Sequence, residues 1–160
     1  DDLGVVRRPH DRVGPLERHV APAGFQVRDI RRLAEDLGDV KQVELDPRFA
    51  PAQYNLGWCL NDLERYTEAI AELRKAIQVQ PNYPEAHNEL GYALHQLSRY
   101  PEAIQQYQIA IQQKANYASA HYNLGMSFIA MRNRNGALEQ YRILQRIDSA
   151  RATKLFNQIK

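Results

Sequence analysis

The sequence predicts an all-α solenoid, and three observations carry this prediction. The stretches that begin at Tyr54, Asn88 and Tyr122 align without a gap, at a constant interval of about 34 residues. Each copy holds two apolar patterns at i, i+3, i+4, i+7 spacing, separated by a short polar turn, which is typical of two antiparallel helices. No segment has the alternation of a strand, so we expect helix pairs that stack on one another.

The flanks of the repeats predict further elements. Apolar residues at helical spacing before the first copy indicate an additional helix with Asp29 as N-cap, and "ARATKLFNQI" after the last copy indicates a closing helix. Glycines and prolines interrupt the first residues so often that we expect an extended arm there. The predicted organisation is an arm over 1–28, a half-repeat cap over 29–49, repeats over 50–83, 84–117 and 118–149, and a capping helix over 150–160.

A Leu-Gly pair recurs in every copy and places Gly57, Gly91 and Gly125 inside helices. A phosphate-binding loop needs clustered glycines between a strand and a helix, so these isolated glycines argue against a nucleotide site. We expect instead that a side chain at each position would obstruct the neighbouring helix. Such an obstruction would offset the cost of about 1 kcal/mol for glycine in a helix.

These features together resemble the tetratricopeptide repeat family. The resemblance covers residues 50 to 149 and rests on the period, the Leu-Gly pair, the second-helix alanine, the aromatic four residues later and Pro81. It implies a right-handed solenoid of three helix pairs in which the first helix of each pair lines the concave face. The sequence departs from the family pattern at Gln53, His87, Ala115, His121 and Ser149.

The resemblance places polar and aromatic residues on that concave face and implies a groove for a peptide. Aromatic rings supply contact area, amides bond a ligand backbone, and acids favour a basic or neutral partner. Some of these rings would serve only as half-buried packing residues. The predicted groove residues are Tyr54, Asn55, Trp58, Asp62, Asn88, Glu89, Tyr92, Gln96, Tyr122, Asn123 and Met126.

Family members that bind the C-terminal carboxylate of heat-shock chaperones carry Lys or Arg and Asn on this face. Here Glu89 stands in the Asn column, and Pro51, Glu85 and Ser119 occupy a column where Lys is needed. A carboxylate would be repelled by Glu89. We therefore do not expect binding of chaperone tails.

Charge is spread unevenly along the chain. From residue 131 onward there are seven bases against two acids, a net of +5, whereas residues 50 to 117 have five bases against seven acids, a net of −2. A basic end can dock an acidic protein, anionic lipid headgroups or nucleic acid, but most charge runs are solvated helix faces. Nucleic acid is the least expected of these three partners, because the chain lacks aromatic residues interleaved with the basic ones. The predicted basic docking surface is Arg132, Arg134, Arg142, Arg146 and Arg151.

No catalytic, metal or cofactor site is predicted. His87 and His95 lie two helical turns apart, about 12 Å along the axis, which is too far for one metal. His87 and His121 share a repeat column where we expect flat packing rings. Cys59 shares its column with Ala93 and Ser127, as expected for a small buried side chain rather than a nucleophile.

The sequence thus predicts a non-catalytic scaffold or adaptor that holds a protein segment in its groove, as a subunit or assembly factor of a larger complex. The alternative is a structural subunit that docks through its arm or its basic end, with the groove unused or filled by the arm. No apolar run of about 18 residues predicts a membrane span. No signal peptide is visible after Asp1, but a leader already removed would leave the same sequence, so the cytoplasm, the periplasm and export all stay open.

Overall fold

The structure is a computed structural model, and it describes residue 16 and residues 50–160. The arm predicted over 1–28, apart from Leu16, and the cap predicted over 29–49 lie outside the described residues. Within these residues there are helices and no strands, which confirms the all-α solenoid. The helices are α2 (Ala50–Asp62), α3 (Tyr66–Val79), α4 (Pro84–Gln96), α5 (Tyr100–Gln113), α6 (Ala118–Ala130), α7 (Arg134–Ile147) and α8 (Ser149–Ile159).

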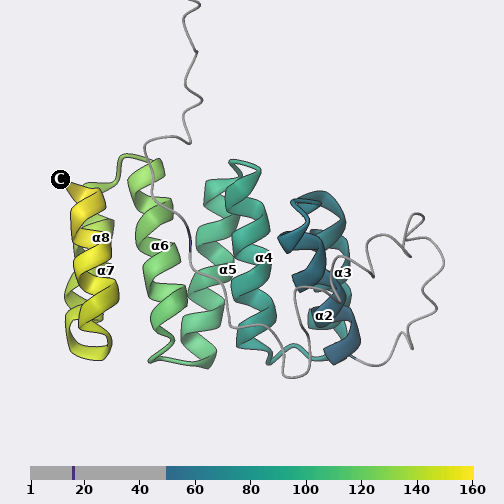
Figure 1. Cartoon of the computed structure of the whole chain (residues 1–160). Coiled ribbons are helices and arrows are strands. Elements are labelled where there is room, and N and C mark those ends of the chain that lie inside the picture. Colours follow the sequence, from purple (N-terminus) through teal and green to yellow (C-terminus); the bar gives the residue numbers. More distant parts are fainter. Residues whose placement is uncertain (1–15, 17–49) are drawn as a thin grey trace, which may run out of the picture.

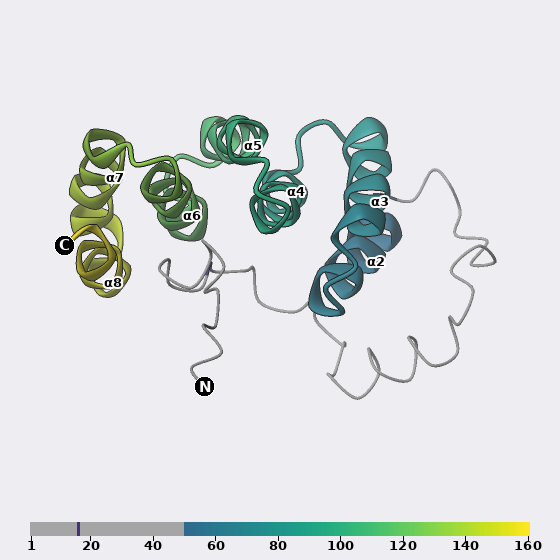
Figure 2. The same cartoon turned by 90° about the horizontal axis from the view of Figure 1, so that it is seen from above.

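The helices stand side by side in one stack (Figure 1). Consecutive helices pack as antiparallel pairs, α2 with α3, α4 with α5 and α6 with α7, and α8 closes the stack against α6 and α7. Figure 2 shows α3, α5 and α7 on the outer side of the arc and α2, α4, α6 and α8 on the inner side. The first helix of each pair therefore lines the concave side.

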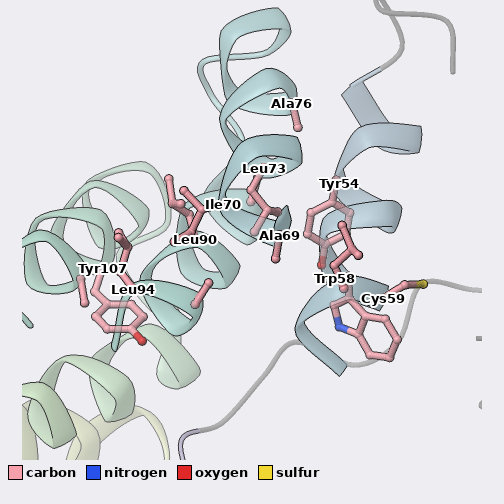
Figure 3. Close-up of a cluster of buried hydrophobic side chains, with 14 of the residues drawn as sticks. Tyr54, Trp58, Cys59, Ala69, Ile70, Leu73, Ala76, Leu90, Leu94 and Tyr107 are labelled. Carbon is pink, nitrogen blue, oxygen red and sulfur yellow. The ribbon is translucent and has the colours of Figure 1, made fainter. Parts of the chain in front are cut away.

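The repeated glycines allow the two helices of a pair to approach closely. A Cβ at Gly57 would lie 2.6 Å from the side chain of Leu73, and one at Gly91 would lie 2.6 Å from the ring of Tyr107. Both partners lie in the buried cluster of Figure 3, which extends from Tyr54 and Trp58 on α2 through Leu73 on α3 to Tyr107 on α5. The expected packing role of these two glycines is confirmed.

The third pair packs differently. A Cβ at Gly125 would meet Leu155 of α8 at 2.6 Å rather than Tyr141 of α7, the residue that occupies the same column as Leu73 and Tyr107. Tyr141 stacks instead on Phe156, with ring centroids 5.0 Å apart. The capping helix therefore inserts its own apolar face against α6, and this explains why Leu155 is fully buried.

The turn inside each pair uses a residue with a left-handed backbone. Glu64, Ser98 and Arg132 have φ near +60° and occupy the same position in successive repeats. At the first turn, Arg65 N donates to Leu60 O at 2.8 Å and Glu64 N donates to Asn61 O at 3.1 Å, and equivalent bonds recur in the other two turns. This pattern is a Schellman motif, which satisfies carbonyl groups at the end of the first helix and reverses the chain.

The histidine column holds hydrogen-bonded packing rings. His87 Nδ1 lies 2.8 Å from Gln106 Oε1, and its Nε2 lies 3.2 Å from the carbonyl oxygen of Pro81. The same arrangement recurs in the next repeat, where His121 Nδ1 lies 2.8 Å from Gln140 Oε1. Each ring thus ties the first helix of a pair to the second helix and to the preceding loop, in agreement with the expected packing role.

Candidate functional site

The predicted groove residues lie on α2, α4 and α6, but most of them are not exposed. Asn55, Tyr92 and Gln96 are half-buried, and Asp62 is exposed. The other predicted residues are between 0 and 6% exposed: Tyr54, Trp58, Asn88, Glu89, Tyr122, Asn123 and Met126. The inner face is therefore a set of interlocked polar and aromatic side chains with a few more open positions.

Amide side chains connect neighbouring inner helices. Asn123 Nδ2 on α6 donates to Asn88 Oδ1 on α4 at 3.2 Å. Ser127 Oγ donates to the carbonyl oxygen of Asn123 at 3.0 Å and lies 2.8 Å from His95 Nδ1, so the histidine donates this second bond. His95 is thus part of a buried network between α4 and α6, and its ring also meets Tyr100 edge-on at 5.0 Å.

The carboxylate of Glu89 lies at the centre of a second polar cluster. Asn61 Nδ2 on α2 donates to Glu89 Oε2 at 3.2 Å and to the Glu89 carbonyl oxygen at 3.1 Å. Burial and then the charge of Glu89 raise the pKa of the hydroxyls of Tyr54, Tyr107 and Tyr117. These hydroxyls therefore stay protonated at neutral pH and can donate hydrogen bonds close to a negative charge.

Several polar atoms around Glu89 are buried without a hydrogen-bond partner in the described part of the chain. They include Tyr54 Oη, Asn61 Oδ1, Asn88 Nδ2 and Tyr107 Oη. A buried polar group left unpaired costs about 1–3 kcal/mol. Tyr54, Asn61 and Asn88 belong to the inner helices α2 and α4, whereas Tyr107 belongs to the outer helix α5, so the first three are the donors and acceptors nearest the concave side.

The end of the inner face near α8 is apolar. Tyr122 and Met126 of α6 form a buried cluster with Leu144, Ala152 and Leu155. Leu16, from the segment expected to be an arm, packs against this cluster and is half-buried. Sequence reasoning missed this contact, because periodicity contains no information on where a segment without repeats will lie.

Sequence reasoning also missed Asn61, Tyr117 and Ser127, although two of them carried a signal. Asn61 is in the same repeat column as His95, and Ser127 is in the column of Cys59. Both columns face a neighbouring inner helix. A polar residue in such a column predicts a hydrogen bond between helices, whereas the identity of its partner follows only from the packing.

The five predicted basic residues are spread over about 20 Å along α7 and its two ends. Arg132 and Arg134 lie at one end of α7, and with Ile129 and Ile159 they line a cavity of about 150 Å³. Arg142 and Arg146 are exposed along α7. Arg151 lies beyond the other end of α7, which is about 20 Å from the first, and it pairs with Asp148.

The described helices show no group of three or more His, Cys, Asp or Glu residues placed to hold a metal ion. Cys59 is buried at 6% exposure. In the same part of the chain, no helix has the length and apolar character needed to span a membrane.

Comparison with known proteins agrees with this architecture. The TPR repeat family matches residues 60–98 and 91–131. No curated protein sequence matches significantly. Among solved structures, YrrB, described as a TPR protein with an unusual peptide-binding site, has a TM-score of 0.72 and 23% identity over 81% of this chain and 67% of its own.

Two further structures are similar over nearly their whole length. The first TPR of Spaghetti (RPAP3), bound to the HSP90 peptide SRMEEVD, has a TM-score of 0.67 and 19% identity, covering 73% of this chain and 94% of its own. The TPR2B domain of yeast Sti1, in a pHsp70 complex, has a TM-score of 0.64 and 21% identity, covering 69% and 94%. At these identities the likeness concerns the fold, and the fold agrees with the family match and the repeat columns. Residues 60–131 thus match the tetratricopeptide repeat family, and the described helices have the fold of solved tetratricopeptide repeat proteins.

Proposed function

We propose that the protein is a non-catalytic interaction scaffold that holds a peptide segment of a partner against the inner face of α2, α4 and α6. The observation that supports this proposal most directly is a set of buried polar atoms at Tyr54, Asn61 and Asn88 that have no hydrogen-bond partner within the described chain. Half-buried Tyr92 lies on the same inner helices. Unpaired amides and hydroxyls suit a ligand that brings its own backbone groups, and aromatic rings suit its side chains. As an adaptor of this kind, it would act as a subunit or assembly factor of a larger complex.

The neighbouring structures support a peptide ligand, since Spaghetti was solved with an HSP90 peptide and Sti1 in a pHsp70 complex. The residues of this chain favour a different peptide chemistry. Glu89 places a carboxylate at the centre of the face, and Glu85 pairs with Lys114 at 3.1 Å. Acidic tails would meet repulsion there, so the proposed partner segment is basic or neutral.

Tyr92 and Asn55 are the best probes of this proposal. Trp58 is only 6% exposed, so Trp58→Ala would remove core packing as well as any ligand contact. A partner would first be identified by pull-down from the native source with mass spectrometry, and its capture then compared among variants. We expect Tyr92→Ala and Asn55→Ala to weaken capture at least about tenfold, as hot-spot truncations do.

The matched control is Gln108→Ala, on the exposed outer face of α5, which should capture the partner normally. Thermal unfolding of each variant separates binding from stability. Undiminished capture by both inner-face variants would refute the proposal. So would a loss of capture that merely follows a loss of stability.

The contact of Leu16 with the cluster on α6 and α8 favours a second candidate, a structural subunit whose arm docks it onto a complex or whose groove is self-filled. Deleting residues 1–24 discriminates between the two candidates. Loss of assembly on deletion, with silent inner-face variants, would assign the function to the arm.

A further inference from the structure

A small cavity lies where the turn between α6 and α7 meets the end of α8. It has a volume of about 150 Å³ and is lined by Ile129, Arg132, Arg134 and Ile159. Both isoleucines pack against the buried cluster that α6, α7 and α8 share, so the apolar wall of the cavity is held in place. None of the four lining residues is one of the predicted groove residues.

The two arginines of this cavity have no acidic partner. Neither side chain forms an ion pair or a hydrogen bond with the described residues. In the first repeat the arginine of the equivalent turn, Arg65, donates to both carboxylate oxygens of Glu68, at 2.7 and 2.6 Å, and the second repeat has the same pair. Gly136 occupies the column of Glu68 in the third repeat, so the carboxylate is missing there.

The backbone that carries the arginines is fixed by local hydrogen bonds. Arg132 N donates to Ile129 O at 2.9 Å, and Asn133 N donates to Phe128 O at 2.8 Å. The side chain of Asn133 also accepts from Gly136 N at 3.0 Å, at the start of α7. A ligand would therefore have to order only the arginine side chains, which lowers the entropy cost of binding.

The lining of the cavity fits an aliphatic side chain next to a carboxylate. An engineered protein cavity of about 150 Å³ lined by aliphatic and aromatic side chains holds benzene, so a leucine side chain fits a space of this size. Each arginine can donate two parallel N–H bonds to a carboxylate. Apolar and cationic groups side by side thus match an acidic segment that contains an aliphatic residue.

The same features argue against a membrane surface. Clusters of about four to eight basic residues mark the binding of anionic lipids, whereas this cavity has two. The nearby Arg151 adds no free charge, because it pairs with Asp148. A cavity that holds one leucine side chain is also too small for an acyl chain.

We propose that this cavity binds an acidic peptide segment of a partner, with an aliphatic side chain between the two isoleucines and carboxylates on Arg132 and Arg134. The site goes beyond the proposed function, since it lies outside the groove and takes a peptide of the opposite charge. The protein would then hold two segments, a basic or neutral one on the inner face and an acidic one at this cavity.

The peptide acetyl-GSDLEGS-amide tests the inference in a titration of the isotope-labelled full-length protein, followed by NMR. We expect the amide signals of Arg132, Arg134 and Ile159 to shift. Replacing both acids of the peptide by their amides should weaken binding at least about tenfold, and replacing its leucine by alanine should weaken it about tenfold. No binding of the parent peptide at about 1 mM, or equal binding of the three peptides, would overturn the proposal.

Protein variants locate the contact. Arg132→Gln and Arg134→Gln should each weaken binding of the parent peptide about tenfold, whereas Arg142→Gln, the matched control on the exposed side of α7, should bind like the wild type. Ile159→Ala should reduce the preference for the leucine peptide over the alanine peptide. An equal loss with Arg142→Gln would show general charge attraction and would overturn the site. Thermal unfolding of each variant checks that it is folded.

Two further measurements separate this site from a membrane surface and from the inner face. In sedimentation with phosphatidylserine vesicles we expect the protein to stay in the supernatant; vesicle binding that needs both arginines, without peptide binding, would overturn the peptide as the ligand. Tyr92→Ala should bind the acidic peptide normally. A loss of this peptide with Tyr92→Ala would overturn the separate site, whereas a partner captured through Tyr92 without any binding of the acidic peptide would leave only the proposed function standing.

Discussion

Gly91 is a position where the two helices of a pair have very little room, and it supports a quantitative prediction. A Cβ there would lie 2.6 Å from Tyr107 Cε1 and 2.9 Å from both Cδ1 and Cζ. Carbon atoms in contact prefer about 3.5–4.0 Å, so Gly91→Ala creates an overlap of about 1 Å with three atoms of one ring. Tyr107 is 0% exposed, and its rigid ring has no open space to enter.

The cost of this overlap can be set against the helix propensity of alanine. Forcing an extra methyl group into a packed core costs about 1–3 kcal/mol, and a rigid buried ring favours the upper end. Alanine gains about 1 kcal/mol over glycine in a helix. We therefore expect Gly91→Ala to lower the free energy of unfolding by about 2 kcal/mol. For a chain of 160 residues this corresponds to a Tm lower by about 4–8 °C.

Urea unfolding followed by circular dichroism measures this change, and a double-mutant cycle with Tyr107→Ala identifies its source. Without the ring, Gly91→Ala should become stabilising by about 1 kcal/mol, because only the propensity gain is left. A Gly91→Ala protein as stable as the wild type would refute the close-approach argument. An equal loss in the Tyr107→Ala background would show that the clash lies elsewhere.

Three other perturbations test the supports of the stack. Asp148 is the N-cap of α8 and accepts a hydrogen bond from Arg151 N at 3.0 Å. Asp148→Ala should therefore lower the free energy of unfolding in denaturant by about 1 kcal/mol. An unchanged free energy of unfolding would contradict the capping role. That backbone bond, followed by the side chain of Arg151, lowers the pKa of the Asp148 carboxyl. The stability that Asp148 adds to the fold is therefore complete above the ordinary pKa of about 3.9 and disappears as the pH falls through the lowered pKa. Wild type and Asp148→Ala should then become equally stable in acid. Arg132 has φ of 59°, a left-handed backbone in which glycine relieves about 1–2 kcal/mol of strain but adds about 1 kcal/mol of unfolded-state entropy. Arg132→Gly should therefore leave the protein equally stable or stabilise it by up to about 1 kcal/mol. A marked destabilisation would contradict this account of the turn. His121→Ala should destabilise by about 1–3 kcal/mol in thermal unfolding, because Gln140 loses its 2.8 Å partner in a buried site, and an unchanged Tm would show that the bond is dispensable.

The contacts within a helix pair could be predicted well, because they follow from sequence period. The sequence predicted that a side chain at each repeated glycine would obstruct the neighbouring helix, and this holds at Gly57 and Gly91, where the obstructing residues are Leu73 and Tyr107. The histidine column was predicted as packing, and its glutamine partners recur at the same interval as the histidines. These contacts repeat because each pair has the same loop and the same register.

The candidate site was harder to predict, since exposure depends on what lies against a helix. Asn88, Glu89 and Asn123 were expected on a groove wall and are 0% exposed. Asn88 and Asn123 bond to each other, while Glu89 accepts from Asn61. The partners in these two bonds are far apart in the sequence, and no short-range pattern specifies which amide meets which.

The sequence by itself determined the number and order of the repeated helices, because the apolar spacing and the glycine positions are local and recur in every repeat. Only the tertiary structure decided how the inner face is connected, how α8 replaces Tyr141 against Gly125, and that Leu16 lies on the α6 cluster. The physical reason is that these contacts join segments with no shared period. Their geometry depends on the curvature of the whole stack and on which side chains fit between helices once the pairs have formed.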